Sequence, residues 1–134
     1  MKYISTRNQE KEYDFREVFI KGLADDGGLF VPKFIPKLSE KELIKLSNLS
    51  YKDLAKEIIY IFCEGTISKE KLSTIVEKSY STFSKKNVVE IASIGENKLL
   101  ELFYGPTYSF KDIAMQFIGQ LYDHYLKDIN KKIN

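Results

Sequence analysis

The sequence is poor in the residue types that form many recognisable sites: its 134 residues contain one cysteine, one histidine and no tryptophan. Cys63 has no disulfide partner within the chain, and its apolar surroundings, IIYIFC, favour a buried thiol over a nucleophile. His124 lies in a predicted helix without a serine, a cysteine or metal-ligand spacing around it, which favours a structural or surface role. We therefore expect no metal site and a reducing compartment.

The chain also lacks a strong net charge and a long hydrophobic run. Its 21 basic and 19 acidic residues are interleaved and leave a net charge of +2, which argues against nucleic acid or an anionic membrane as a partner. The N-terminal MKYISTRNQEKEYDF has no apolar core of signal-peptide length, and it carries acidic residues that a transit peptide would lack. No run approaches the length of a membrane span. We expect a cytoplasmic protein with no nucleic-acid and no membrane partner.

The first 38 residues combine a strand-like segment, KYIST, with a helical pattern after Asp14 in which Phe15, Val18, Phe19 and Leu23 share one side. The stretch ADDGGLFVPKFIP then interrupts the helix. Its paired aspartates and glycines lack the alternating oxygen ligands of a calcium loop, so we predict a tight turn there.

Residues 39–84 are predicted to form three short helices. Each begins at a serine that can cap it: Ser39, which forms a capping box with Glu42, then Ser50 and Ser68. Each helix has an apolar stripe, and we expect these stripes to pack against one another with the charged faces in solvent.

The pattern changes after SKKN at 84–87. The runs VVEIASI and KLLELFY are β-prone, and the triplet Gly95-Glu96-Asn97 between them predicts a hairpin. A helix from about Ser109 to about Lys127 then carries apolar residues on most of its surface and is expected to be covered on most sides. Because these strands are fewer than the roughly five of a typical sheet, we place one domain at 1–87 and the incomplete start of a second at 88–134.

The segment GPTYSFKDI raises a functional question because it places Lys111 in the first turn of that helix. A positive charge there costs about 0.3–1 kcal/mol, and burial beside Phe110 and Ile113 would favour the neutral amine. A neutral amine can attack an aldehyde to form a Schiff base, and the bend at Gly105-Pro106 would hold it above the carboxyl end of a strand, where open α/β folds bind ligands. The alternative is an exposed lysine whose stem lies on the surface while Asp112 offsets the dipole cost.

Three further polar residues are candidates for binding, each with an ordinary structural explanation. Thr107 and Ser109 could reach a substrate or cofactor, but turn and helix-cap roles account for them. Arg7 could bind an anion, although an ordinary surface arginine is the default interpretation.

Two blocks of the sequence resemble the threonine synthase family of fold type II pyridoxal-phosphate enzymes. LLELFYGPTYSFKDIAMQF is similar to the family's lysine segment, L-E-L-F-H-G-P-T-x-x-F-K-D, while YISTRN, GLADDGGLFVPKFIP and LSYKDLAKEII resemble its N-terminal domain. The resemblance implies an α/β protein: a helical N-terminal domain followed by the truncated start of a fold type II α/β domain. It also implies that Lys111 is both the catalytic and the cofactor-binding residue and holds pyridoxal phosphate as a Schiff base.

The implied activity is the conversion of O-phospho-L-homoserine and water to L-threonine and phosphate, with Lys111 moving protons at the substrate. Two residues depart from the family pattern. Tyr104 stands where histidine is usual, and Asn8 stands where glycine is common. A tyrosine can hydrogen-bond and stack, but it does not titrate near neutral pH, so the proton-transfer role of that histidine does not carry over.

Length is the other departure. Family members have several hundred residues, and their glycine-rich phosphate-binding loop follows the lysine, whereas no such loop follows Lys111 in these 134 residues. We expect this truncated chain alone to bind the cofactor weakly and to be inactive. The alternative is a noncatalytic interaction module or a remnant of a pyridoxal-phosphate enzyme, with self-association through exposed apolar surface. A different pyridoxal-phosphate enzyme is a third alternative, against which GLADDGGLFVP argues.

Overall fold

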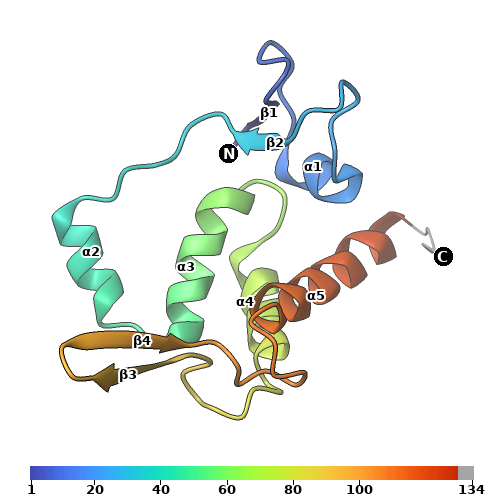
Figure 1. Ribbon diagram of the computed structural model, residues 1–134. Coiled ribbons are helices and arrows are strands. Elements are labelled where there is room, and N and C mark those ends of the chain that lie inside the picture. The colour runs from blue at the N-terminus through green and yellow to red at the C-terminus, as the bar shows by residue number, and fades with distance from the viewer. Residues whose placement is uncertain (130–134) are drawn as a thin grey trace.

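The computed structural model describes residues 1–129 of the chain. This part contains five helices and four strands, the strands forming two separate two-stranded antiparallel sheets (Figure 1). In chain order the elements are β1 (Tyr3–Ser5), α1 (Phe15–Lys21), β2 (Phe30–Pro32), α2 (Glu40–Ser47), α3 (Tyr51–Cys63), α4 (Lys69–Ser79), β3 (Glu90–Ile94), β4 (Asn97–Glu101) and α5 (Asp112–Ile129). The described chain is therefore a mixed α/β structure, as the sequence predicted.

The first sheet pairs the predicted strand β1 with β2, a strand that the sequence pattern did not indicate. Ser5 lies opposite Phe30, and Tyr3 lies opposite Pro32. The predicted tight turn before β2 is confirmed: Gly27 N donates to Ala24 O at 2.9 Å.

The helix starts largely follow the predicted caps. Both halves of the Ser39–Glu42 capping box are formed, and Ser50 and Ser68 each accept a hydrogen bond from the backbone at the third position of the helix. Helix α1 ends at Gly22, whose φ of 75° suits glycine. The predicted apolar side of α1 was therefore two residues too long: Leu23 lies beyond the helix and is exposed.

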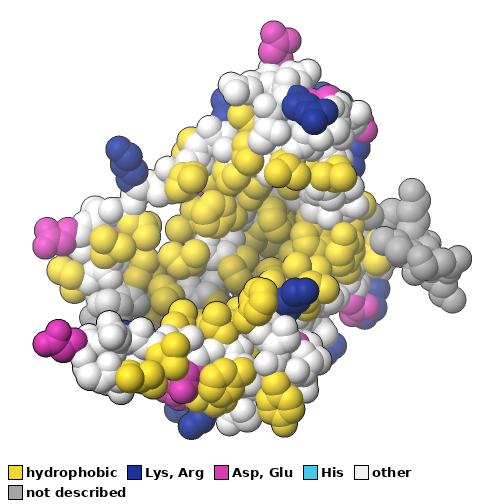
Figure 2. Space-filling model, in the orientation of Figure 1, with side chains coloured by type: hydrophobic (Ala, Val, Ile, Leu, Met, Phe, Trp, Pro, Cys, Tyr) yellow, Lys and Arg dark blue, Asp and Glu magenta, His cyan; other side chains and the backbone are white. Residues whose placement is uncertain are grey.

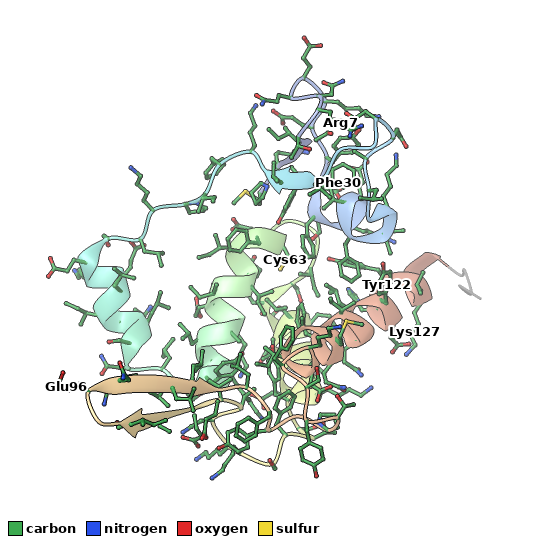
Figure 3. The ribbon with its side chains drawn as sticks, viewed as in Figure 1. Arg7, Phe30, Cys63, Glu96, Tyr122 and Lys127 are labelled. Carbon is green, nitrogen blue, oxygen red and sulfur yellow. The ribbon has the colours of Figure 1, made fainter. Side chains whose placement is uncertain are left out.

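The main core lies where α3, α4 and α5 meet (Figure 1). It contains Leu72 and Val76 of α4 with Leu121 and Tyr125 of α5, all of them at most 1% exposed. The N-terminal region joins this core through tyrosine hydroxyls. Tyr3 donates to Phe62 O at 2.8 Å, and Tyr122 projects from α5 towards α1 and donates to Phe19 O at 3.3 Å (Figure 3).

Helix α2 does not join that core. It has no buried residue, and its apolar residues Leu43 and Ile44 are 52% and 59% exposed. The expectation that all three short helices pack together is therefore correct for α3 and α4 but wrong for α2 in the part of the chain described, where α2 lies apart from α4 and α5 (Figure 1).

The second sheet is the predicted hairpin, with a tighter turn than expected. Asn97 pairs with Ile94, so the loop consists of Gly95 and Glu96 alone, and Gly95 adopts a φ of 60°. Strand β4 ends at Glu101, short of the predicted end at Tyr104, because Tyr104 O accepts hydrogen bonds from Ser84 and leaves the ladder.

Helix α5 differs from its prediction at its start and in its cover. It begins at Asp112, three residues later than expected, and its buried residues face α4 and α1. The expected cover on most sides is not found in residues 1–129, since Met115 remains 57% exposed. No helix in the described range is both long and apolar enough to cross a membrane.

Replacing Leu72 by alanine tests the core. Leu72→Ala should lower the free energy of unfolding by about 2–5 kcal/mol, because it leaves a cavity beneath a side chain that is 1% exposed. Leu43→Ala is the matched control on the exposed side of α2 and should change stability by no more than about 0.5 kcal/mol. Urea unfolding followed by circular dichroism measures both, and equal losses in the two variants would contradict this core.

Cys63 supplies a second test because burial raises the pKa of its thiol to about 11. The thiolate is the reactive form, so at pH 8 the folded chain should react with a disulfide reagent about a hundredfold more slowly than the chain in urea. The absorbance of the released chromophore measures both rates. Similar rates in the two conditions would mean that Cys63 is accessible in the native state.

Candidate functional site

The candidate site is the turn between β4 and α5, residues 102–111. Its start is held by Tyr104, whose carbonyl oxygen accepts from Ser84 N at 3.0 Å. The chain then reverses at Gly105, whose carbonyl oxygen accepts from Tyr108 N at 3.1 Å. Tyr108 adopts a φ of 59°, a left-handed conformation that is uncommon for a residue with a side chain. The turn is therefore a fixed structure with a strained residue at its centre.

Asp112 closes the turn from the first position of α5. Its side chain is buried, with 3% of the residue exposed, and both carboxylate oxygens accept from Thr107: Oδ2 from the backbone N–H at 2.8 Å and Oδ1 from Oγ1 at 2.9 Å. A Cβ at Gly105 would lie 2.4 Å from the Asp112 Cβ, so the bend requires glycine there. Sequence reasoning gave Asp112 only a charge-offsetting role. In the sequence, Gly105 was the one signal that the backbone and the Asp112 side chain come close together.

Lys111 lies immediately before α5. Its backbone N–H donates to Ser109 Oγ at 3.3 Å, and its carbonyl oxygen accepts from Met115 N at 2.8 Å, the first full turn of the helix. Lys111 thus immediately precedes the helix, and its carbonyl oxygen accepts the first helical hydrogen bond, whereas the sequence predicted Ser109 as the cap. Ser109 supports the turn instead.

The Lys111 side chain is exposed, as in the alternative stated from the sequence, and its apolar neighbours do not bury it. Phe110 is itself 64% exposed, because no part of the chain within residues 1–129 covers this side of α5. No described residue forms a hydrogen bond or ion pair with the Lys111 Nζ. The amine is therefore accessible and unpaired on a backbone that is held on both sides.

An accessible, unpaired amine can condense with an aldehyde cofactor such as pyridoxal phosphate, but within residues 1–129 Lys111 does not have the enclosed apolar surroundings that activate a lysine nucleophile. The cofactor's phosphate would need backbone amides or cations around it. Two clefts of the structure do not adjoin Lys111 and are lined by other parts of the chain. One, of about 740 Å³, adjoins β1 and β2, and another, of about 500 Å³, is lined by residues in and before α1. The described residues therefore offer an accessible amine at Lys111 for covalent attachment, while neither of these clefts would enclose the cofactor's phosphate beside it.

Tyr104, which stands where the family has histidine, has its hydroxyl engaged. It donates to a carboxylate oxygen of Glu101, and Lys85 Nζ lies 5.5 Å from the centre of its ring. The hydrogen bond to Glu101, together with burial, raises the pKa of Tyr104 to about 12. Tyr104 therefore stays protonated at neutral pH and acts as a hydrogen-bond donor, in agreement with the interpretation made from the sequence.

The other candidate residues lie elsewhere or are already engaged. Arg7 lies beside the first sheet, where its guanidinium donates to Asp26 O at 3.1 Å (Figure 3). Asn8 accepts from Glu10 N at 3.0 Å in a local turn. His124 is on α5 with its ring beside that of Tyr125. Across residues 1–129 there is no group of three or more metal-ligating side chains.

Comparison with known proteins gives consistent matches. The family described as "Threonine synthase N terminus" matches residues 2–80. The threonine synthase of Eremothecium gossypii is 39% identical over 98% of this chain, and that of Pseudomonas aeruginosa is 37% identical over 99%. The chain spans 27% and 29% of the lengths of these two relatives.

Solved structures agree. The pyridoxal-phosphate-bound threonine synthase of Brucella melitensis matches 98% of this chain with a TM-score of 0.94 and 32% identity. The yeast threonine synthase matches 99% with a TM-score of 0.92 and 38% identity, and this chain covers 29% and 28% of those two structures. The chain belongs to the threonine synthase family and corresponds to its N-terminal part.

Proposed function

We propose that this chain is the N-terminal part of a pyridoxal-phosphate-dependent threonine synthase that converts O-phospho-L-homoserine and water to L-threonine and phosphate. The observation that carries the proposal is the unpaired Lys111 amine at the end of an ordered turn, in a chain whose fold matches a synthase with that cofactor bound. We further propose that it acts in the cytoplasm, since its single cysteine suits a reducing compartment.

Lys111 has two roles in this proposal. Its amine binds the cofactor covalently, and once substrate has displaced it, the same amine moves protons at the α and β carbons of the substrate. Bound pyridoxal phosphate supplies an electron sink for carbanion chemistry. The four-carbon stem of the lysine gives the amine the reach for both roles, while the hydrogen bonds of the turn keep its backbone in place.

The second half of the chain, residues 88–134, is proposed to begin the α/β domain of fold type II. The hairpin supports this because each of its faces carries exposed apolar residues. Ile91 lies opposite Leu100 on one face, while Ile94 and Leu99 lie on the other, and all four are between 47% and 67% exposed. Strand pairs with two apolar faces are typical of sheets covered on both sides. Residues 1–87 remain the predicted N-terminal domain.

Reductive labelling tests the role of Lys111. With pyridoxal phosphate and borohydride, Lys111 should be labelled about tenfold more than an exposed lysine such as Lys86, because hydrogen bonds of the turn and of the first helical turn hold the backbone on both sides of Lys111. Peptide mapping by mass spectrometry measures the label at each lysine.

Two variants control this experiment. Lys111→Ala should abolish the selective label, whereas Lys86→Ala, at another exposed site, should leave it unchanged. Labelling spread evenly over the lysines of the unaltered chain would contradict the proposal.

We expect the 134 residues alone to show no synthase activity, because a single reversible bond is a weak hold on the cofactor.

The exposed apolar face also supports self-association of the chain as a second candidate property. Figure 2 shows apolar side chains gathered in a hollow that extends from the hairpin towards α2 and the first sheet. Exposed apolar residues on these elements include Leu43, Ile44, Ile91 and Leu100. A continuous apolar surface of this kind favours contact with a second copy of the chain in solution.

Sedimentation velocity tests this association. The unaltered chain should sediment faster as its concentration rises, and Ile91→Lys with Leu100→Glu should weaken the association about tenfold, because this pair replaces apolar contact area with an ion pair across the strands. Ser93→Glu is the control, since it adds a charge opposite Lys98 without removing an apolar side chain. A chain that stays monomeric at every concentration would rule this association out.

A further inference from the structure

Asp112 is the only buried carboxylate in the described range, and its burial needs a physical explanation. A carboxylate withdrawn from water is costly unless it is hydrogen-bonded. Here Thr107 supplies both hydrogen bonds, one from its backbone and one from its side chain, and the N-terminus of α5 adds a favourable dipole. The turn before Lys111 is therefore organised around one side chain.

The turn is held by three residues, Gly105, Thr107 and Asp112, which act together. Gly105 leaves the space that Asp112 occupies, since an added Cβ would lie 2.5 Å from Oδ2. Thr107 reaches Asp112 across five residues and so closes the turn into a ring. Lys111 is inside this ring, directly bonded in sequence to Asp112, and the ring holds the direction of its Cα–Cβ bond.

We propose that Asp112 is a positioning residue for Lys111: by binding Thr107 it orders the Lys111 backbone and thereby directs the amine towards the aldehyde of the cofactor. This inference rests on the proposed covalent role of Lys111. Asp112 itself does not touch the cofactor in this proposal. Its effect is to reduce the set of directions that the lysine side chain explores, which raises the effective concentration of the amine at one place.

Two substitutions separate this role from the charge of Asp112. Asp112→Ala removes both hydrogen bonds to Thr107. Asp112→Asn keeps both, because the amide oxygen accepts from the Thr107 N–H and the amide nitrogen donates to Thr107 Oγ1. Thr107→Val is a milder variant that removes only the Oγ1 hydrogen bond and serves if Asp112→Ala does not fold.

The first measurement needs no cofactor. The ¹⁵N relaxation order parameter of the Lys111 amide should be about 0.85 in the unaltered chain and in Asp112→Ala should fall below about 0.6, the values for rigid and flexible backbone. Asp112→Asn should stay near the unaltered value, and Thr107→Val should lie between. A rigid Lys111 amide in a folded Asp112→Ala chain would overturn the proposal.

The second measurement is the label at Lys111 from pyridoxal phosphate and cyanoborohydride. The amine nitrogen bonds to the aldehyde carbon, the aldehyde oxygen leaves as water, and hydride from cyanoborohydride with a proton from solvent completes a stable secondary amine. Asp112→Ala should lower the Lys111 label about tenfold relative to Lys86, and Asp112→Asn should restore it. Unchanged selectivity in Asp112→Ala, or a loss in Asp112→Asn equal to that in Asp112→Ala, would overturn the positioning role.

The two measurements distinguish failure of this inference from failure of the proposed function. If the unaltered chain shows no preference for Lys111, the covalent role fails, and the positioning of the amine for the cofactor fails with it, whatever the order parameters. If Lys111 is labelled selectively in the unaltered chain and equally in Asp112→Ala, the covalent role stands and only the positioning role is lost.

Discussion

The packing of α5 against α4 is the contact on which the candidate site depends. Leu121 and Tyr125 bury one side of α5 completely in the core shared with α4, and this fixes the axis of the helix. The N-terminal end of the helix then fixes the place where the turn from β4 must finish. Lys111 is exposed because the opposite side of α5 has no neighbour within residues 1–129. The packing thus fixes where Lys111 lies, and the hydrogen bonds between Thr107 and Asp112 hold the turn that precedes it.

Local signals predicted the helices well, and long-range contacts explain what was missed. The caps at Ser39, Ser50 and Ser68 involve groups three residues apart, so the sequence alone indicates them. Strand β2 is three residues long and exists because it pairs with β1, which lies on the other side of α1 in the sequence, and no local pattern encodes this pairing. An amphipathic helix such as α2 shows which face is apolar but not which partner covers it.

The same distinction applies to the candidate site. The resemblance to threonine synthases identified Lys111, and the bend at Gly105 was visible in the sequence as a glycine followed by a proline. The buried position of Asp112 was not predictable, because it depends on the space that Gly105 leaves and on a hydrogen-bond donor five residues earlier. The exposure of Lys111 also depends on what does or does not pack beside it, and sequence spacing carries no information about that.

The tyrosine contacts between distant segments have a consequence for the order in which the chain folds during synthesis. Tyr3 binds the backbone at Phe62, and Tyr122 binds the backbone at Phe19, so each contact closes a long loop. Helices α3 and α4 leave the ribosome well before Leu121 and Tyr125, the residues that complete their core. A nascent chain must therefore carry an open apolar surface on α4 until α5 has been made, and this interval is when it is most exposed to aggregation or to capture by a chaperone.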